Sequence, residues 1–134
     1  MAQKPRVVKL EAKSDERGTL IEFLHLDEIG LREGQIYCTV TGPGFVRANH
    51  YHSRKTEWFC VIGGEGKIML RDRKSGREQE IFLGEKSGMK AVMIPPNCIH
   101  ALKNVGRTKM YHVAYISERY KKDDPDTFFE KILD

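Results

Sequence analysis

The sequence predicts an all-β domain in which many short strands form a sandwich or a barrel. Apolar and polar residues alternate with a period of two over most of the chain, which is the pattern of half-buried strands. Glycine, proline and asparagine interrupt this alternation at short intervals, and segments with helical periodicity are scarce. Short strands separated by turn residues are typical of sandwiches and barrels.

The candidate strands follow one another along almost the whole chain. The turn-like sequence SDERG separates the first two, and KSG forms a hairpin tip further on. The sequence LDEIGLRE, residues 26–33, could supply one helical turn. The expected strands span residues 6–13, 18–26, 34–42, 56–64, 66–73, 77–84, 89–96 and 110–120.

The last residues, DPDTFFEKILD, predict a short C-terminal helix that docks on the domain. Asp124 or Asp126 could act as its N-cap, because a carboxylate can accept hydrogen bonds from the first free amides of a helix. The apolar side of this helix would consist of Phe128, Phe129, Ile132 and Leu133.

Length and composition indicate a single domain over residues 1–134. A chain of 134 residues can bury a proper core, and its 40% hydrophobic and 31% charged content is typical of a soluble protein. The formal net charge is +4. A nucleic-acid partner would require a concentrated basic face, so we expect none, whereas a small anionic substrate suits a modest positive charge.

The cysteines and the N-terminus predict a cytoplasmic location. Cys38, Cys60 and Cys98 are an odd number without CxxC spacing, which argues against a disulfide framework. No apolar run resembles a signal peptide or reaches the length of a membrane span, so we expect no membrane partner.

The stretch RANHYHSRKTEWF holds three residues that could share one site. His50 and His52 are two residues apart, so on a strand their side chains project from the same face. Glu57 has the opposite parity and would point away from them on a straight strand. The polar sequence SRKT predicts a turn between them, after which Glu57 would begin a new strand and face the same interior point.

His100 is the fourth candidate for this site. It follows a Pro-Pro-Asn turn that fixes the preceding backbone. Three imidazoles and one carboxylate form a plausible ligand set for a divalent transition metal, and zinc, nickel, iron or copper suit these donors. We expect metal ligation by His50, His52, Glu57 and His100, with zinc favoured and nickel or iron next.

The order of these residues resembles the two motifs of the cupin superfamily. The first motif is matched by Gly44, His50, His52, Glu57 and Gly64. The second motif is matched by Pro95, Asn97, His100 and Asn104. The resemblance implies a jelly-roll barrel, or double-stranded β-helix, with the histidines inside its mouth.

Two further segments resemble cupins that modify nucleotide sugars. DERGTLIEF and VRANHYH are similar to segments of the dTDP-4-dehydrorhamnose 3,5-epimerases and the 3,4-ketoisomerases. Most of the chain also resembles the C-terminal cupin domain of capsular-polysaccharide epimerase/reductases, although Ala48 stands where those proteins have glycine. The resemblance implies a nucleotide-linked 4-ketosugar substrate, proton abstraction beside its ketone, and epimerisation or ketone migration.

The resemblance also implies roles for individual residues. His50 would be the base in a metal-free epimerase, His50 and His52 together would act in a ketoisomerase, and a bound metal could instead polarise the ketone. Other roles are expected from the residues themselves. Among the candidate tyrosines, Tyr115 lies on a late strand that could line the barrel and could supply an acid on the opposite face of the sugar, although packing is the commoner role of a tyrosine. The substrate diphosphate would be bound by Arg47, Arg17 and Arg54, although strand parity places Arg47 opposite His50 unless a bulge intervenes.

Some interpretations remain open at this point. One alternative is a metal-dependent cupin of another class, such as a dioxygenase or a sugar-phosphate isomerase, and another is a non-catalytic cupin that binds a small ligand. No strand–GxGxxG–helix unit is present and GGEG reads as a hairpin turn, so we expect no nicotinamide or flavin cofactor. Any reductase of the pathway would then be a separate chain. The strand RVVKLEA has no nearby hairpin partner, which together with the resemblance predicts a homodimer.

Overall fold

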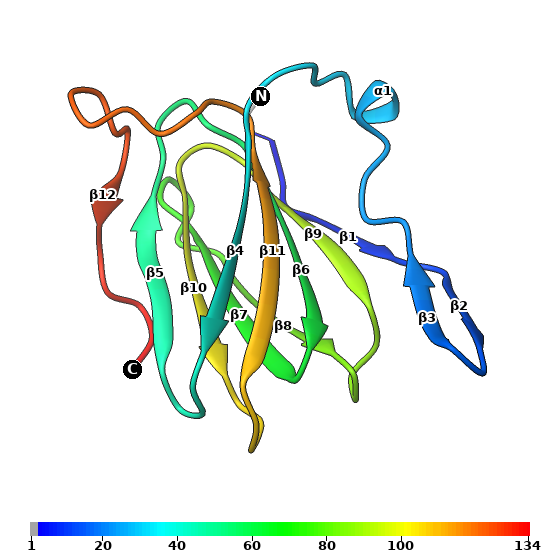
Figure 1. Ribbon diagram of the computed structural model, residues 1–134. Helices are drawn as coiled ribbons and strands as arrows, with labels where there is room; N and C mark the ends of the chain where they lie inside the picture. The colour runs from blue at the N-terminus through cyan, green and yellow to red at the C-terminus, as the bar shows by residue number, and fades with distance from the viewer. Residues whose placement is uncertain (1–2) are drawn as a thin grey trace.

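The computed structural model describes residues 3–134, which form two antiparallel five-stranded sheets packed face to face (Figure 1). The first sheet contains, in spatial order, β1 Arg6–Lys9, β9 Lys90–Ile94, β6 Glu57–Gly63, β11 Met110–Ile116 and β4 Gln35–Thr41. The second contains β12 Phe128–Phe129, β5 Val46–Tyr51, β10 Cys98–Asn104, β7 Glu65–Asp72 and β8 Glu78–Gly84. A hairpin of β2 Ala12–Asp15 and β3 Gly18–Ile21 and the one-turn helix α1 Leu26–Ile29 complete the described elements.

The connections confirm the expected jelly-roll barrel. From β4 to β11 the chain passes to the other sheet after every strand except β7, which is joined to β8 by a hairpin. The sequence GGEG therefore joins β6 to β7 across the two sheets, and its expected role as a hairpin turn is wrong. Gly64 has a φ of +80°, and a Cβ there would lie 2.6 Å from the carbonyl oxygen of Lys109. Glycine is required at this crossing because the backbones approach so closely.

The period-two pattern determines which side chains fill the barrel. Phe59 and Val61 of β6 point inward and pack in one cluster with Ile68 and Leu70 of β7. Trp58 lies on the outer face of the same strand, in a second cluster with residues from β9 and β11. Residues between 10 and 31 cover this second cluster.

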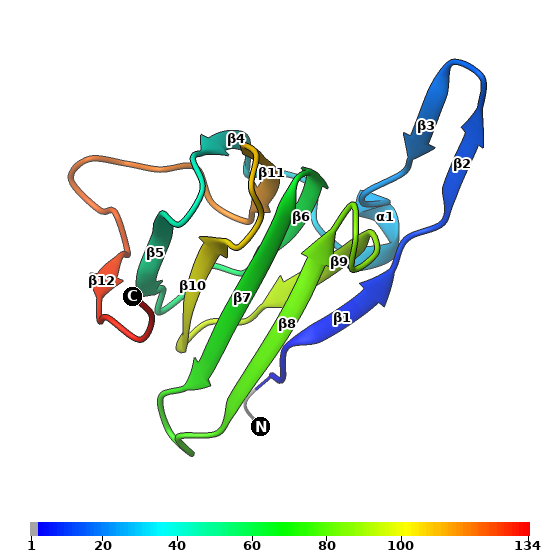
Figure 2. The same ribbon diagram turned by 90° about the horizontal axis from the view of Figure 1, so that it is seen from below.

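The first expected strand is divided into two strands with different partners. Arg6–Lys9 pairs with β9 inside the same chain, and Ala12–Asp15 pairs with β3 in a hairpin that projects from the body on the side remote from β5 and β12 (Figures 1 and 2). Arg6–Lys9 thus has no hairpin partner nearby in the sequence, as expected, but it does pair with a distant strand of the same chain. It nevertheless lies at the edge of its sheet, with β9 on one side.

The expected C-terminal helix is wrong, because this segment is extended and runs antiparallel beside β5 (Figure 1). Phe128 and Phe129 form β12, which pairs with Tyr51 and His50, and Phe129 is 80% exposed. Two contacts favour this path over a helix. The Asn49 carboxamide oxygen accepts the amides of residues 132 and 133, and Asp126 accepts amides of another loop instead of capping a helix.

No helix in the described part of the chain is long and apolar enough to cross a membrane.

Candidate functional site

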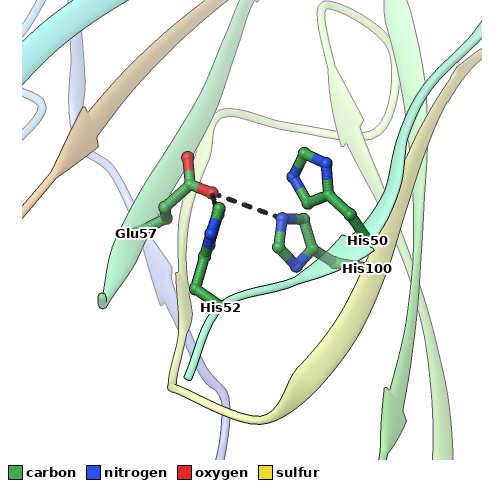
Figure 3. Close-up of side chains that lie close together, drawn as sticks. All are labelled: His50, His52, Glu57 and His100. Carbon is green, nitrogen blue, oxygen red and sulfur yellow. Dashed lines mark hydrogen bonds and ion pairs between the residues drawn. The ribbon is translucent and has the colours of Figure 1, made fainter. Parts of the chain in front are cut away.

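The four expected ligand residues meet inside the barrel (Figure 3). His50 lies on β5 directly opposite His100 of β10, His52 follows the end of β5, and Glu57 begins β6. One potential ligand atom from each residue lies within 4.8 Å of those of the other three. The structure thus brings together all four residues that the spacing predicts.

The turn between His52 and Glu57 is stabilised by Asp126. Its carboxylate accepts the backbone N–H groups of Ser53 and Arg54, each at 2.9 Å, and that of Lys55 at 3.3 Å. Burial alone would raise the pKa of Asp126, but the Ser53 hydroxyl and these amides outweigh it and lower the pKa to about 2. The carboxylate thus stabilises the turn that reverses the chain direction, and this turn allows Glu57 to face the histidines.

Two backbone carbonyls orient the histidine rings. His52 Nδ1 donates to the carbonyl oxygen of Asp126 at 2.6 Å, and His100 Nδ1 donates to that of Cys98 at 3.1 Å. Each ring then directs Nε2 to Glu57 Oε1, at 2.7 Å from His52 and 3.3 Å from His100. Histidines that bind metals characteristically donate their second N–H to a carbonyl or a carboxylate.

The donor set fits a transition-metal ion. His100 Nε2 is buried and has no hydrogen-bond partner among the described residues, although it lies within ion-pair distance of Glu57. A buried nitrogen without a partner costs free energy, and coordination of an ion would remove that cost. Imidazole nitrogens with one carboxylate are donors that zinc, nickel and iron accept.

Burial and mutual charge set the protonation of the cluster. Burial, together with the neighbouring His100 and His52, lowers the pKa of His50 to about 3, so His50 is neutral at neutral pH. Burial opposes ionisation of Glu57 and His52, yet their hydrogen bond and mutual attraction outweigh it. The pKa of Glu57 is therefore lowered and that of His52 raised. Neutral imidazole is the form that can accept a proton or bind a metal.

Tyr37 is a site residue that the sequence reasoning missed. Its hydroxyl donates to Glu57 Oε2 at 2.6 Å. Burial and the adjacent carboxylate raise the pKa of Tyr37 far above its ordinary value, so its hydroxyl stays protonated. The sequence QIYCTVT could have revealed Tyr37 as a site residue. In β4 every second residue is polar and points inward, whereas the apolar Ile36 and Val40 are exposed. An inverted pattern of this kind indicates a polar interior.

Beside the cluster lies a cavity of about 220 Å³. It is smaller than the roughly 300–1,000 Å³ that drug-sized ligands occupy, so its size suits one sugar ring rather than a whole nucleotide sugar. It is lined by Gln35, Tyr37, His50, His52, Lys55, Glu57, Ile116, Tyr120 and Thr127.

The structure places Arg47 on the same face of β5 as His50. Ala48 and Asn49 have φ values of +72° and +55° and form a bulge, so Arg47 pairs with Leu102 while His50 pairs with His100. On a regular strand Arg47 and His50 would point to opposite faces, and the bulge brings them to the same face. The Arg47 guanidinium donates to the Thr41 hydroxyl at 2.6 Å.

The other two arginines do not approach the cluster in this chain. Arg17 lies at the exposed tip of the β2–β3 hairpin and forms an ion pair with Asp15 at 2.6 Å. Arg54 lies in the loop after His52, where its guanidinium contacts two exposed carboxylates at 3.0 and 3.2 Å. Within one chain Arg17 lies too far from the cavity to bind the substrate there, because its hairpin projects from the side of the body remote from β5 (Figures 1 and 2).

Tyr115 is not in a position to act on a substrate in the cavity, which corrects its expected catalytic role. It pairs with Trp58 across the sheet and belongs to the outer cluster, while its neighbour Ala114 packs in the barrel core. Its hydroxyl donates to the carbonyl oxygen of Glu33. The strand register explains this orientation. Tyr115 lies opposite Trp58, which points outward, whereas Ile116 lies opposite Glu57, which points inward.

The bulge gives a stability prediction. Replacing Ala48 by glycine should increase the free energy of unfolding by about 0.5–1 kcal/mol. The left-handed conformation costs an L-residue roughly 1–2 kcal/mol, and glycine removes this cost. The greater entropy of glycine in the unfolded chain offsets part of the gain. Urea unfolding measures the change. The control Ala12→Gly on β2, an exposed strand residue outside the left-handed region, should lower stability instead. Equal destabilisation by both variants would contradict the bulge strain.

Comparison with known proteins places the chain in a family. It is 34% identical over 116 residues to the UDP-2-acetamido-2,6-beta-L-arabino-hexul-4-ose reductase of Pseudomonas aeruginosa, covering 86% of this chain but only 30% of that protein. It is 27% identical over 124 residues to a probable low-salt glycan biosynthesis epimerase of Haloferax volcanii, covering 87% of this chain and 80% of the relative.

A solved structure confirms the cupin fold. The dTDP sugar isomerase of Desulfovibrio desulfuricans superimposes with a TM-score of 0.85 at 22% identity, over 98% of this chain and 85% of that protein. The model of one protein family matches residues 13–128, which is most of the sequence. The chain therefore belongs to the family described as "Polysaccharide biosynthesis C-terminal domain".

Proposed function

We propose that this protein exchanges a proton on the carbon beside the ketone of a nucleotide-linked 4-ketosugar and so epimerises the sugar or moves its ketone. The observation that carries the proposal is the position of His50, whose imidazole lines a cavity of sugar-ring size in a chain of this family. Relatives named as a hexul-4-ose reductase and as a glycan biosynthesis epimerase support the same substrate class.

The residues of the cavity suit the chemistry. A ketone acidifies the neighbouring C–H bond, and its removal requires a base together with donors for the oxygen on which charge develops. His50 supplies a neutral imidazole at neutral pH. Tyr37 donates its single hydroxyl proton to Glu57, so it orients that carboxylate and is not a donor to the ketone oxygen.

We also propose that His50, His52, Glu57 and His100 hold a divalent metal, with zinc favoured over nickel and iron. When bound, such an ion would act as a Lewis acid towards the ketone. The carbonyls of Asp126 and Cys98 keep two of the imidazoles directed at the site. His50 has two possible roles: it can serve as a metal ligand or, in a metal-free site, as the base.

The function is tested by incubating the protein with dTDP- and UDP-linked 4-ketosugars in heavy water and following the C3 and C5 protons by NMR. We expect loss of at least one of these signals and the appearance of an epimer or of a 3-ketosugar. Absence of exchange above background across the panel would instead favour a metal-dependent cupin of another class or a ligand-binding cupin.

The chain spans less than a third of the matched reductase. Residues 1–134 contain no strand–GxGxxG–helix unit that would bind a nicotinamide cofactor. We propose that any reduction of the product is carried out by a separate reductase. NADH or NADPH added to the purified protein should therefore leave the product a ketone.

We further propose a homodimer that forms through the edge strand β1. Val7 and Val8 on this edge are 41% and 39% exposed, and an uncovered strand edge favours association. Light scattering at micromolar concentration should give twice the chain mass. Val8→Lys should shift the mass towards the monomer, while Phe82→Lys on the edge strand β8 of the other sheet should not. A monomeric wild-type protein would contradict the dimer.

A further inference from the structure

We propose that the ammonium group of Lys55 donates a hydrogen bond to the oxyanion formed from the substrate ketone during proton exchange, whether or not a metal is bound, an inference that rests on the proposed function. Lys55 is 2% exposed and lines the cavity that also holds His50 and Glu57. Lysines are rarely buried to this extent unless they are paired with an acid.

The buried charge of Lys55 is largely uncompensated. Its Nζ donates to the carbonyl oxygen of Pro125 at 3.1 Å, and no carboxylate of residues 3–134 forms an ion pair with it. The two carboxylates close to Lys55 are engaged by other groups. Glu57, two residues along the chain, contacts His52 and His100, and Asp126 accepts backbone amides, including that of Lys55. Burying an ammonium with one neutral acceptor costs free energy, and an anionic group of a ligand would offset that cost.

The backbone holds this lysine in place before any ligand arrives. Its amide donates to Asp126 Oδ2 at 3.3 Å, and the neighbouring Ser53 and Arg54 amides bind the same carboxylate. The side chain is fixed at its other end by Pro125. A donor fixed in advance and shielded from water stabilises developing negative charge more strongly than a mobile one.

The cavity size indicates which anion the ammonium meets. About 220 Å³ suits the sugar ring, so a diphosphate and a nucleoside would extend outside it. In the exchange step the base takes the proton from the carbon beside the ketone. The C–H electron pair then forms a carbon–carbon double bond, and the former C=O π pair moves to the oxygen. Lys55 donates a hydrogen bond to that oxyanion without transferring a proton, and the carbon is reprotonated from solvent.

The first test compares Lys55→Met with Lys103→Met. Lys103 is a comparable control because its Nζ also donates to a main-chain oxygen of the C-terminal segment, that of Asp134 at 2.9 Å, yet it does not line the cavity. We expect Lys55→Met to slow deuterium exchange about 10²–10³-fold, the loss typical of a removed oxyanion donor. Its melting temperature should be equal to or higher than that of the wild type, because a costly buried charge is gone. Unchanged exchange in Lys55→Met overturns the proposal, and so does slower exchange that parallels a lower melting temperature.

A second measurement does not depend on turnover. Formate serves as a small monoanion, and the melting temperature of chelator-treated protein is followed as formate is added, with chloride at equal ionic strength as the reference. We expect formate to stabilise the wild type and Lys103→Met, and to have no effect on Lys55→Met. If no 4-ketosugar exchanges but formate behaves in this way, the proposed function fails while the oxyanion site stands. If formate stabilises all three proteins equally, Lys55 does not form an anion site.

Discussion

Replacement of Glu57 by alanine is expected to weaken divalent-metal binding at least about 10²-fold, since loss of residues that merely support a ligand already costs 10–100-fold. Glu57 Oε1 lies 2.7 Å from His52 Nε2 and 3.3 Å from His100 Nε2, so this oxygen is shared by two of the proposed ligands. Competition with a chromophoric chelator measures the affinity, with zinc as the first ion tested.

The same substitution should also lower the stability of the metal-free protein. Removing the carboxylate leaves the Tyr37 hydroxyl and the His52 ring without their partner in a buried site, and breaking a buried pair costs about 3–5 kcal/mol. Affinity is therefore measured only on protein shown to be folded by circular dichroism.

The choice of control for this experiment follows from the structure. Glu65 is unsuitable, because its carboxylate accepts the amides of Lys86 and Ser87 and supports their loop. Glu80→Ala is a better control, since Glu80 is exposed on β8 and forms an ion pair with Lys67 at 3.7 Å. Equal metal affinity in Glu57→Ala and Glu80→Ala would remove Glu57 from the ligand set.

Local rules in the sequence predict an all-β sandwich or barrel and the shared face of His50 and His52, whereas the jelly-roll barrel is what the cupin resemblance implies. Period-two alternation identifies most strands, and the two-residue separation of His50 and His52 places them on one face whatever the rest of the chain does. The turn before Glu57 is also visible in its polar residues. His100 needs the cupin resemblance as well, since nothing local reveals that β10 pairs with β5.

Other features depend on contacts between distant residues and escape local reasoning. Asp126 has the residue type of an N-cap, yet it accepts amides more than 70 positions away, and no periodicity encodes that choice. The bulge at Ala48 and Asn49 changes the parity of Arg47, and alanine gives little warning of a left-handed conformation. The residue type of Tyr115 suits an acid, but its position on the outward face of β11 places it in the outer cluster.

Replacement of His50 by alanine is the change expected to affect activity most. If His50 is the base, deuterium exchange beside the ketone should fall about 10²–10⁴-fold, the usual contribution of a positioned base. Burial and the neighbouring His100 and His52 lower the pKa of this imidazole to about 3, so it is neutral at neutral pH but a weaker base than a free imidazole. NMR in heavy water gives the rate.

Metal content measured on the same samples separates the two possible roles of His50. Loss of exchange with the metal retained identifies His50 as the base, whereas loss of both identifies it as a ligand. His25→Ala is the control, because His25 is exposed and contacts Glu22 and Glu28 near α1, away from the cluster. Exchange that continues at the wild-type rate in His50→Ala would exclude both roles. Another group that lines the cavity would then have to move the proton. The tyrosines that line the cavity are Tyr37 and Tyr120.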